Sequence, residues 1–142
     1  MKDMKVLVPL DGSHNSKRTI KTLFSMKEKI SGSLTLLHVF DHDRISYRGS
    51  PELNYATITE RARAAARRFL EDQRKIFAAE GIEAEVLFKE GPSRKTICDT
   101  ADSGDFDLLI IGRHTEGELR NLIFGQVANY VIHKVKTPIL II

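Results

Sequence analysis

Three positions in this sequence carry residue types suited to holding a phosphorylated ligand. Asp11 follows an apolar run, and a carboxylate there can accept hydrogen bonds from the ligand's hydroxyl groups. Gly112 follows a second apolar run, and Gly125 lies in a later stretch of helical spacing. Glycine lets backbone N–H groups approach a phosphate closely, and a helix N-terminus adds the positive end of its dipole. The alternative for Asp11 is a turn residue that caps the following helix.

The other reactive side chains form no comparable pattern. His38, Asp41, His42 and Asp43 are metal-ligand types, but neighbours along a strand point to opposite faces, so we expect no metal site. Cys98 lies on the inward stripe of a predicted helix, which favours a buried thiol over a reactive one. The sequence also lacks the G-x-x-x-x-G-K-[ST], G-x-S-x-G and H-E-x-x-H motifs. We therefore predict no catalytic residue.

These positions require an alternating α/β framework. Five short apolar runs predict strands at residues 5–10, 34–40, 84–88, 107–111 and 138–142. Helical spacing between them predicts four helices: one capped by Ser13 or Ser16, one at about 57–79 that Gly81 ends, one opening after 91–93, and one before 137–138. The pattern indicates an open five-stranded parallel sheet of order 3-2-1-4-5 with helices on both faces. Two polar segments, 41–51 and 113–120, directly follow strands, where ligands bind in such sheets.

Two faces of the predicted helices carry more specific expectations. The 57–79 helix should bury one stripe, whose members are Ala62, Ala66, Phe69, Leu70, Gln73, Ile76 and Phe77. Its arginine-rich opposite face should be solvated, with Arg67 to Glu71 and Glu71 to Lys75 at ion-pair spacing. The last helix should turn Ile123, Val127, Val131 and Val135 inward.

Composition narrows the class of protein. At 142 residues and 42% hydrophobic content, the chain predicts one globular domain, 1–142, with enough apolar material for a continuous core. The formal net charge of +3 demands no nucleic-acid partner. A single cysteine excludes an internal disulfide, and neither a signal peptide nor a membrane-spanning run is evident, so we expect a cytoplasmic protein without a membrane partner.

Three motifs resemble those of the universal stress protein family, over residues 5–142. They are V-L-V-P-L-D-G-S at 6–13, L-L-H-V at 36–39, and a glycine motif that starts at Gly112. In nucleotide-binding members, that glycine is followed by two residues, a second glycine, nine residues, and Gly with Ser or Thr. Here Gly112 and Gly125 match with the spacing intact, whereas Thr115 and Gln126 depart. The resemblance implies a Rossmann-like fold of the adenine nucleotide alpha hydrolase type.

The resemblance also implies a ligand and its site. An adenine nucleotide, ATP, ADP or AMP, would lie across the tips of strands 1, 2 and 4, with Mg²⁺ only alongside bound ATP. Its base is expected near Pro9, Val39 and Ile111, its ribose near Asp11 and Gly112, and its phosphates near Gly125, Gln126 and Val127. Arg113 and Thr115 complete the predicted site, with Arg113 adding positive charge. Thr115 resists the backbone conformation that glycine adopts freely, which predicts weakened phosphate binding.

Three functions remain open at this point. The first is a stress-response protein that binds an adenine nucleotide and signals as a homodimer through its C-terminal strand, 138–142, and through a protein partner that the sequence does not identify. The second is a scaffold of the same fold that binds no nucleotide, and the departures at Thr115 and Gln126 favour it. The third is slow ATP hydrolysis that uses His114 or His14.

Overall fold

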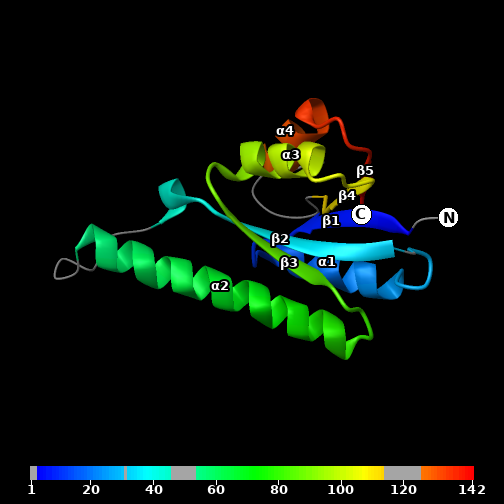
Figure 1. The fold of residues 1–142 in the computed structure, drawn as a ribbon, viewed down its shortest axis with the longest axis horizontal. Coiled ribbons are helices and arrows are strands. Elements are labelled where there is room, and N and C mark those ends of the chain that lie inside the picture. The colour runs from blue at the N-terminus through cyan, green and yellow to red at the C-terminus, as the bar shows by residue number, and fades with distance from the viewer. Residues whose placement is uncertain (1–2, 31, 46–53, 114–125) are drawn as a thin grey trace.

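A twisted parallel sheet of five strands forms the centre of the protein (Figure 1). The computed structural model describes residues 3–30, 32–45, 54–113 and 126–142. The strands are β1 (Met4–Pro9), β2 (Gly32–Phe40), β3 (Glu85–Glu90), β4 (Leu108–Ile111) and β5 (Ile139–Ile141). Their order is β3-β2-β1-β4-β5, and all four pairings are parallel. This confirms the predicted sheet.

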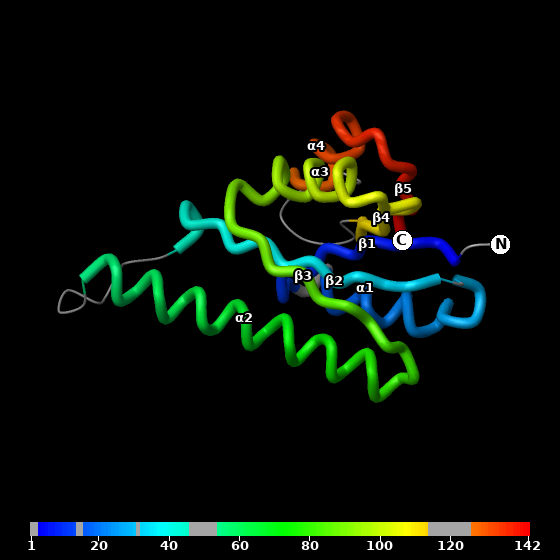
Figure 2. The backbone as a smooth tube through the Cα atoms, viewed as in Figure 1, coloured from blue at the N-terminus to red at the C-terminus, as the bar shows by residue number. Residues whose placement is uncertain are grey.

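Helices cover both faces of the sheet (Figure 2). On one face lie α1 (His14–Ser25) and the long α2 (Tyr55–Ala79), and on the other lie α3 (Ser93–Ser103) and α4 (Gln126–Lys134). A short 3-10 helix, η1 (His42–Arg44), follows β2 and lies in one of the two polar segments. In the described ranges, no helix combines the length and the apolar character needed to cross a bilayer.

The ends of α2 follow from two local contacts. Asn54 Oδ1 accepts a hydrogen bond from the Thr57 backbone N–H at 2.8 Å, so the helix begins at Tyr55, earlier than predicted. At the other end Gly81 adopts φ +80°, a left-handed conformation that favours glycine, and the helix stops as predicted. Ser13 caps α1, because its side chain accepts from the Ser16 N–H.

The buried strands divide their side chains between the two faces. On β1, Val6 and Val8 pack toward α1 and α2, whereas Leu7 between them packs toward α3 and α4. On β4, Ile110 and its neighbour Leu109 divide in the same way, and all five side chains are fully buried. Strands that bury both faces explain why these runs are apolar throughout.

One expectation for α2 is wrong. Ile76 belongs to the predicted buried stripe but is 45% exposed, because Leu70 and Phe77, seven residues apart, form the seam and Ile76 turns away from it. Glu71 pairs with Arg74, one turn along the helix, at 2.5 Å, and the hydrogen bond from Arg74 lowers the pKa of the Glu71 carboxyl. Lys75, at the predicted spacing, also lowers this pKa through its charge. The guanidinium of Arg67 instead lies 4.2 Å from the centroid of the Phe88 ring.

Only part of the stripe predicted for the last helix lies within the described residues. Val131 is fully buried, as expected, while Ile123 lies outside the described residues. The inward stripe of α3 is confirmed, because Ile97, Cys98 and Ala101 are all buried.

Candidate functional site

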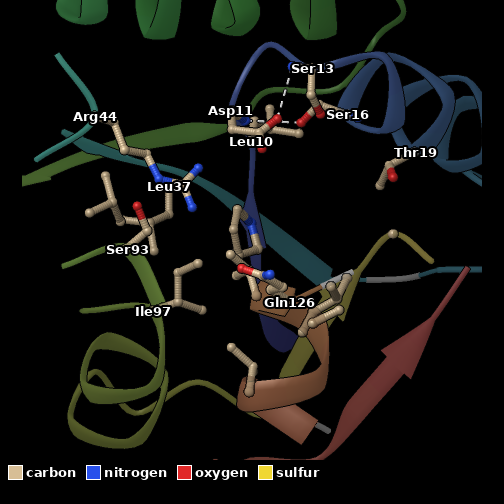
Figure 3. Close-up of a pocket in the computed structure, with 17 residues that line it drawn as sticks. Leu10, Asp11, Ser13, Ser16, Thr19, Leu37, Arg44, Ser93, Ile97 and Gln126 are labelled. Carbon is tan, nitrogen blue, oxygen red and sulfur yellow. Dashed lines mark hydrogen bonds between the residues drawn. The ribbon is translucent and has the colours of Figure 1, made fainter. Parts of the chain in front are cut away.

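A cavity of about 260 Å³ opens at the carboxyl ends of the central strands (Figure 3). The predicted site residues that line it are Pro9, Asp11, Val39, Ile111, Gly112, Gln126 and Val127. They come from the ends of β1, β2 and β4 and from the start of α4. In an open α/β sheet this is the crevice where strand order reverses, since β1 is flanked by β2 and β4 and the chain crosses over in opposite directions.

The turn after β1 forms one polar wall of the cavity. Asp11 Oδ1 accepts from the Ser13 N–H at 2.9 Å, and the Asp11 N–H donates to Ser16 Oγ at 3.0 Å. Gly12 between them adopts φ +79°, and a Cβ there would lie 3.3 Å from the Phe69 ring. Asp11 therefore acts in the turn, as its alternative interpretation expected. A carboxylate has about four acceptor positions, so one such bond leaves capacity for a ligand hydroxyl.

The floor of the cavity is apolar. Leu37, Ile97 and Val131 line it alongside Pro9 and Val39, and two of them, Leu37 and Val131, are fully buried. Flat, uncharged ligand groups suit such a surface, because they displace water from it without losing hydrogen bonds of their own.

Five polar lining residues were not among the predicted ligand contacts: Ser13, Ser16, Thr19, Arg44 and Ser93. Ser16 and Thr19 lie one helical turn apart on α1, which places both on one face. Arg44 belongs to the polar segment 41–51, whose position after a strand was a signal for ligand contact. Ser93 opens α3 directly after β3, and the same signal applies to it.

The remaining predicted residues fall elsewhere. Thr115 and Gly125 lie outside the described residues. Arg113 is described but is not part of the cavity lining. Its N–H donates to Ile142 O at 2.9 Å, and its own carbonyl accepts from Arg18 Nη2 at 2.9 Å. Arg113 therefore extends the pairing of the β4–β5 edge with its backbone.

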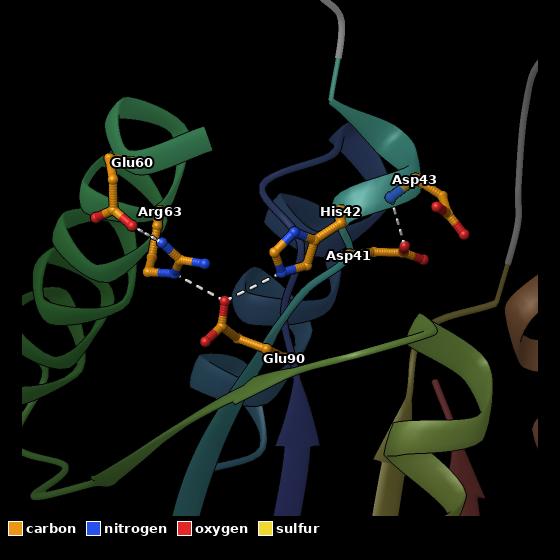
Figure 4. Close-up of polar contacts among 6 residues, drawn as sticks. All are labelled: Asp41, His42, Asp43, Glu60, Arg63 and Glu90. Carbon is orange, nitrogen blue, oxygen red and sulfur yellow. Dashed lines mark hydrogen bonds and ion pairs between the residues drawn. The ribbon is translucent and has the colours of Figure 1, made fainter. Parts of the chain in front are cut away.

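The residues considered for a metal site serve separate structural contacts. His38 Nδ1 lies 2.7 Å from Leu10 O, and Asp41 Oδ2 accepts from the Ser93 N–H at 3.2 Å. His42 Nε2 lies 3.3 Å from Glu90 Oε1 (Figure 4). Across the described ranges, no group of three or more His, Cys, Asp or Glu side chains is arranged to hold a metal ion.

Glu90 also joins the edge of the sheet to α2. Arg63 Nε donates to Glu90 Oε1 at 2.8 Å and also contacts Glu60 (Figure 4). The hydrogen bond from Arg63 lowers the pKa of the Glu90 carboxyl, against the opposing effect of desolvation. This network lies outside the cavity lining and links α2 to β3.

Cys98 is buried on α3. Burial raises the pKa of its thiol, and the nearby Asp102 and Asp99 carboxylates raise it further. A thiol with a raised pKa is a poor nucleophile at neutral pH, so the arrangement gives it a packing role.

Comparison with known proteins extends over almost the whole chain. The model of the universal stress protein family matches residues 4–142. The universal stress protein Sll1388 of Synechocystis sp. is 27% identical over 148 aligned residues, which cover 97% of this chain and 96% of that protein.

Solved structures share the fold. Protein MJ0577 of Methanocaldococcus jannaschii superposes with a TM-score of 0.80 at 23% identity, covering 100% of this chain and 96% of that one. A universal stress protein family protein of Arabidopsis thaliana, solved with AMP bound, superposes with a TM-score of 0.68 at 19% identity, covering 98% and 90% of the two chains. With the family model matching from the first strand to the last residue, this chain belongs to the universal stress protein family.

Proposed function

We propose that this chain binds an adenine nucleotide in the cavity at the carboxyl ends of β1, β2 and β4. The observation that carries the proposal is the make-up of that cavity, which combines an apolar floor with a carboxylate at one strand tip. A relative of the same fold holds AMP, which supports an adenine ligand. ATP, ADP and AMP are all candidates, with Mg²⁺ accompanying ATP.

The proposed pose follows the chemistry of the lining. The base lies on the apolar floor near Pro9, Val39 and Ile111, since a purine ring gains most from apolar contact. The ribose hydroxyls donate to the Asp11 carboxylate, beside Gly112. The phosphates extend toward Gln126 and Val127, where the N-terminal N–H groups of α4 and its dipole favour negative charge.

Arg113, Thr115 and Gly125 remain proposed contacts from the family motif. The chain would act as a single domain, 1–142, in the cytoplasm. It would signal nucleotide occupancy in a stress response to a protein partner, with no catalytic step of its own.

Nucleotide binding is tested by the ligand itself and by substitution of Asp11. Mass spectrometry of ligand released from purified protein, and calorimetry with ATP, ADP and AMP, should both report an adenine nucleotide. Asp11→Ala should weaken binding about tenfold or more, because hydrogen bonds to a charged acceptor contribute about 1.5–3 kcal/mol. Asp11→Asn is the matched control, since its side-chain oxygen can still accept from the Ser13 N–H and preserve the turn.

The alternative function is a scaffold that binds no nucleotide and acts through protein contacts. The departure from the family motif at Gln126, which lines the cavity where a Ser or Thr is expected, favours it. Wild-type protein that shows no binding at millimolar nucleotide would support this alternative and overturn the proposal.

We further propose a homodimer formed through β5. This strand lies at the edge of the sheet, and its three isoleucine and leucine residues are only half-buried. The Ile142 N–H donates to Ile111 O, so alternation along the strand turns the N–H of Ile141 away from β4. Ile141→Pro removes that outward donor while sparing the pairing with β4. We expect the variant to be a folded monomer in light scattering, and an unchanged dimer would contradict this interface.

A further inference from the structure

Arg44 is the one cationic side chain among the described residues that line the cavity. It ends η1, immediately beyond β2, and its side chain is 64% exposed. Figure 3 shows the nitrogen atoms of its guanidinium directed toward the interior of the cavity. Arg44 and Ser93 lie together on one side of the cavity, away from Gln126. No feature of the family motif in this sequence includes Arg44.

The backbone that carries Arg44 is held in place by Asp41. The carboxylate of Asp41 is 15% exposed and accepts from the Asp43 N–H at 3.0 Å. It also accepts from the Ser93 N–H and Oγ, at 3.2 and 3.3 Å, which ties η1 to the first residue of α3. Asp41 Oδ2 lies 4.0 Å from Arg44 Nε, so the carboxylate faces the stem side of the guanidinium. The η1 backbone is therefore fixed, while within the described residues no hydrogen bond holds the end of the Arg44 side chain.

The position of Arg44 separates it from the proposed phosphate end. Beside β1, the tip of β2 lies on one side and the tip of β4 lies on the other. Val39, at the end of β2, belongs to the apolar surface proposed for the base, and the proposed phosphate contacts are on α4, after β4. The base is also proposed near Ile111, on β4, but a cation beyond β2 lies on the side of the base contact Val39, with β1 between it and the phosphate contacts on α4.

From this placement, and resting on the proposed nucleotide function, we infer that Arg44 recognises the base of the bound nucleotide by laying its planar guanidinium against the purine ring. Arginine suits this contact because its guanidinium is flat, delocalised and weakly hydrated. The same chain already places arginines over rings, with the Arg94 guanidinium 5.3 Å from the Tyr130 centroid. Solvent screening weakens the attraction of an exposed cation for a distant phosphate, whereas a stacking contact needs only proximity.

The test compares three ligands that share one base: adenosine, AMP and ATP. Calorimetry with wild type and Arg44→Gln, at low and at high salt, should show binding weakened about two- to fivefold, as expected for an exposed cation–π contact. The factor should be the same for all three ligands and should change little with salt. Arg44→Lys should not restore the full affinity, because lysine keeps the charge but loses the plane that lies against the purine ring.

Arg94→Gln is the matched control. It removes the same charge from the residue next to Ser93, and Arg94 does not line the cavity, so its nucleotide affinities should equal those of wild type. Thermal melting of each variant checks that the fold is intact, which is expected because the Arg44 side chain is exposed.

Three results would overturn the inference. A loss that grows from adenosine to AMP to ATP, shrinks with salt and is rescued by lysine would make Arg44 a phosphate contact. Equal affinities for wild type and Arg44→Gln would show that Arg44 does not touch the ligand, while the proposed nucleotide function would stand. Wild-type protein that binds none of the three ligands would instead overturn the nucleotide function and, with it, this contact.

Discussion

The two faces of the sheet are packed with different kinds of side chain. Helices α1 and α2 bring large residues to their face, among them Leu23, Leu70 and Phe77. Helices α3 and α4 bring smaller ones, including Cys98, Ala101 and Ala128. The strands contribute valine, leucine and isoleucine to both faces, so the contrast comes from the helices.

The cavity lies with the smaller side chains. Its apolar helix-borne lining comes from α3 and α4, through Ile97, Val127, Ala128 and Val131. Close packing leaves few voids larger than a water molecule in most protein interiors, so the small side chain of Ala128 in this lining helps to keep room for a ligand. One face of this sheet is thus filled for stability, while the other keeps space at the strand tips, and alternate residues of the same strands serve both.

The largest effect on stability should come from removing a large side chain on the face that α1 and α2 cover. Phe77 is fully buried and packs edge to face against Phe24, with ring centroids 4.9 Å apart. Phe77→Ala should lower the free energy of unfolding by about 3–5 kcal/mol, from lost burial and the cavity left behind. Urea unfolding measures this loss.

The comparison also requires that Phe77→Ala leave the nucleotide site alone. Under conditions where the variant is fully folded, its nucleotide affinity should match that of wild type. Phe77→Leu, which keeps an apolar side chain at the seam, should lose less stability. A marked loss of affinity with full folding would show that the two faces are coupled.

The second effect comes from filling the open face. Ala128 is 6% exposed and lines the cavity, so Ala128→Leu should abolish nucleotide binding by occupying the space. Ala101, on α3, is equally small and buried but does not line the cavity. Ala101→Leu should cost about 1–3 kcal/mol of stability through overpacking, and Ala128→Leu should cost less because the cavity accepts the added atoms. Calorimetry of both variants measures nucleotide binding, and urea unfolding measures their stability. Together they distinguish a filled cavity from a general loss of stability.

The framework of both faces could be predicted from the sequence, for a local reason. Apolar runs such as β1 and β4 and the helical periods between them report burial directly, and Gly81 marks the end of α2 by its own backbone preference. The strand-tip positions of Asp11 and Gly112 follow from the same pattern, since they come directly after predicted strands.

What could not be predicted depends on contacts between distant segments. Asp41 and Ser93 are 52 residues apart, and their hydrogen bonds hold the 3-10 turn that directs Arg44 to the cavity. No periodicity within 41–51 encodes that turn. The sequence therefore predicts that this segment lies where ligands bind, but it does not single out Arg44. The burial of Ile76 could not be predicted for a related reason. The width of the buried stripe on α2 depends on how the helix lies across the sheet.

The smallest effect should come from the hydrogen bonds that hold α3 in place on the face of the sheet that keeps the cavity. The Asp102 carboxylate, on α3, accepts from the Lys136 N–H at 3.0 Å and from the Thr137 N–H and Oγ1 at 3.0 and 2.9 Å. These bonds tie α3 to the segment that joins α4 to β5. Desolvation acts to raise the pKa of Asp102, but the hydrogen bonds from Thr137 and Lys136 outweigh it, so the pKa lies below its ordinary value of 3.8.

The lowered pKa of Asp102 fixes the sign of its pH dependence. Because the carboxylate is favoured in the folded state, its stabilisation is present above the unfolded pKa and is lost as the pH falls through the folded one. Asp102→Asn removes the charge but keeps an acceptor oxygen, so it should lose less than about 1 kcal/mol at neutral pH, where solvent screens this exposed group. The difference from wild type should begin to shrink as the pH falls below the ordinary value of 3.8 toward the folded pKa, because Asp102 of the wild type becomes protonated over that range. Urea unfolding of both proteins from neutral pH to about pH 3 measures it. A difference that persists unchanged into acid would mean that the charge of Asp102 contributes nothing, and that shape alone holds α3 to the open face.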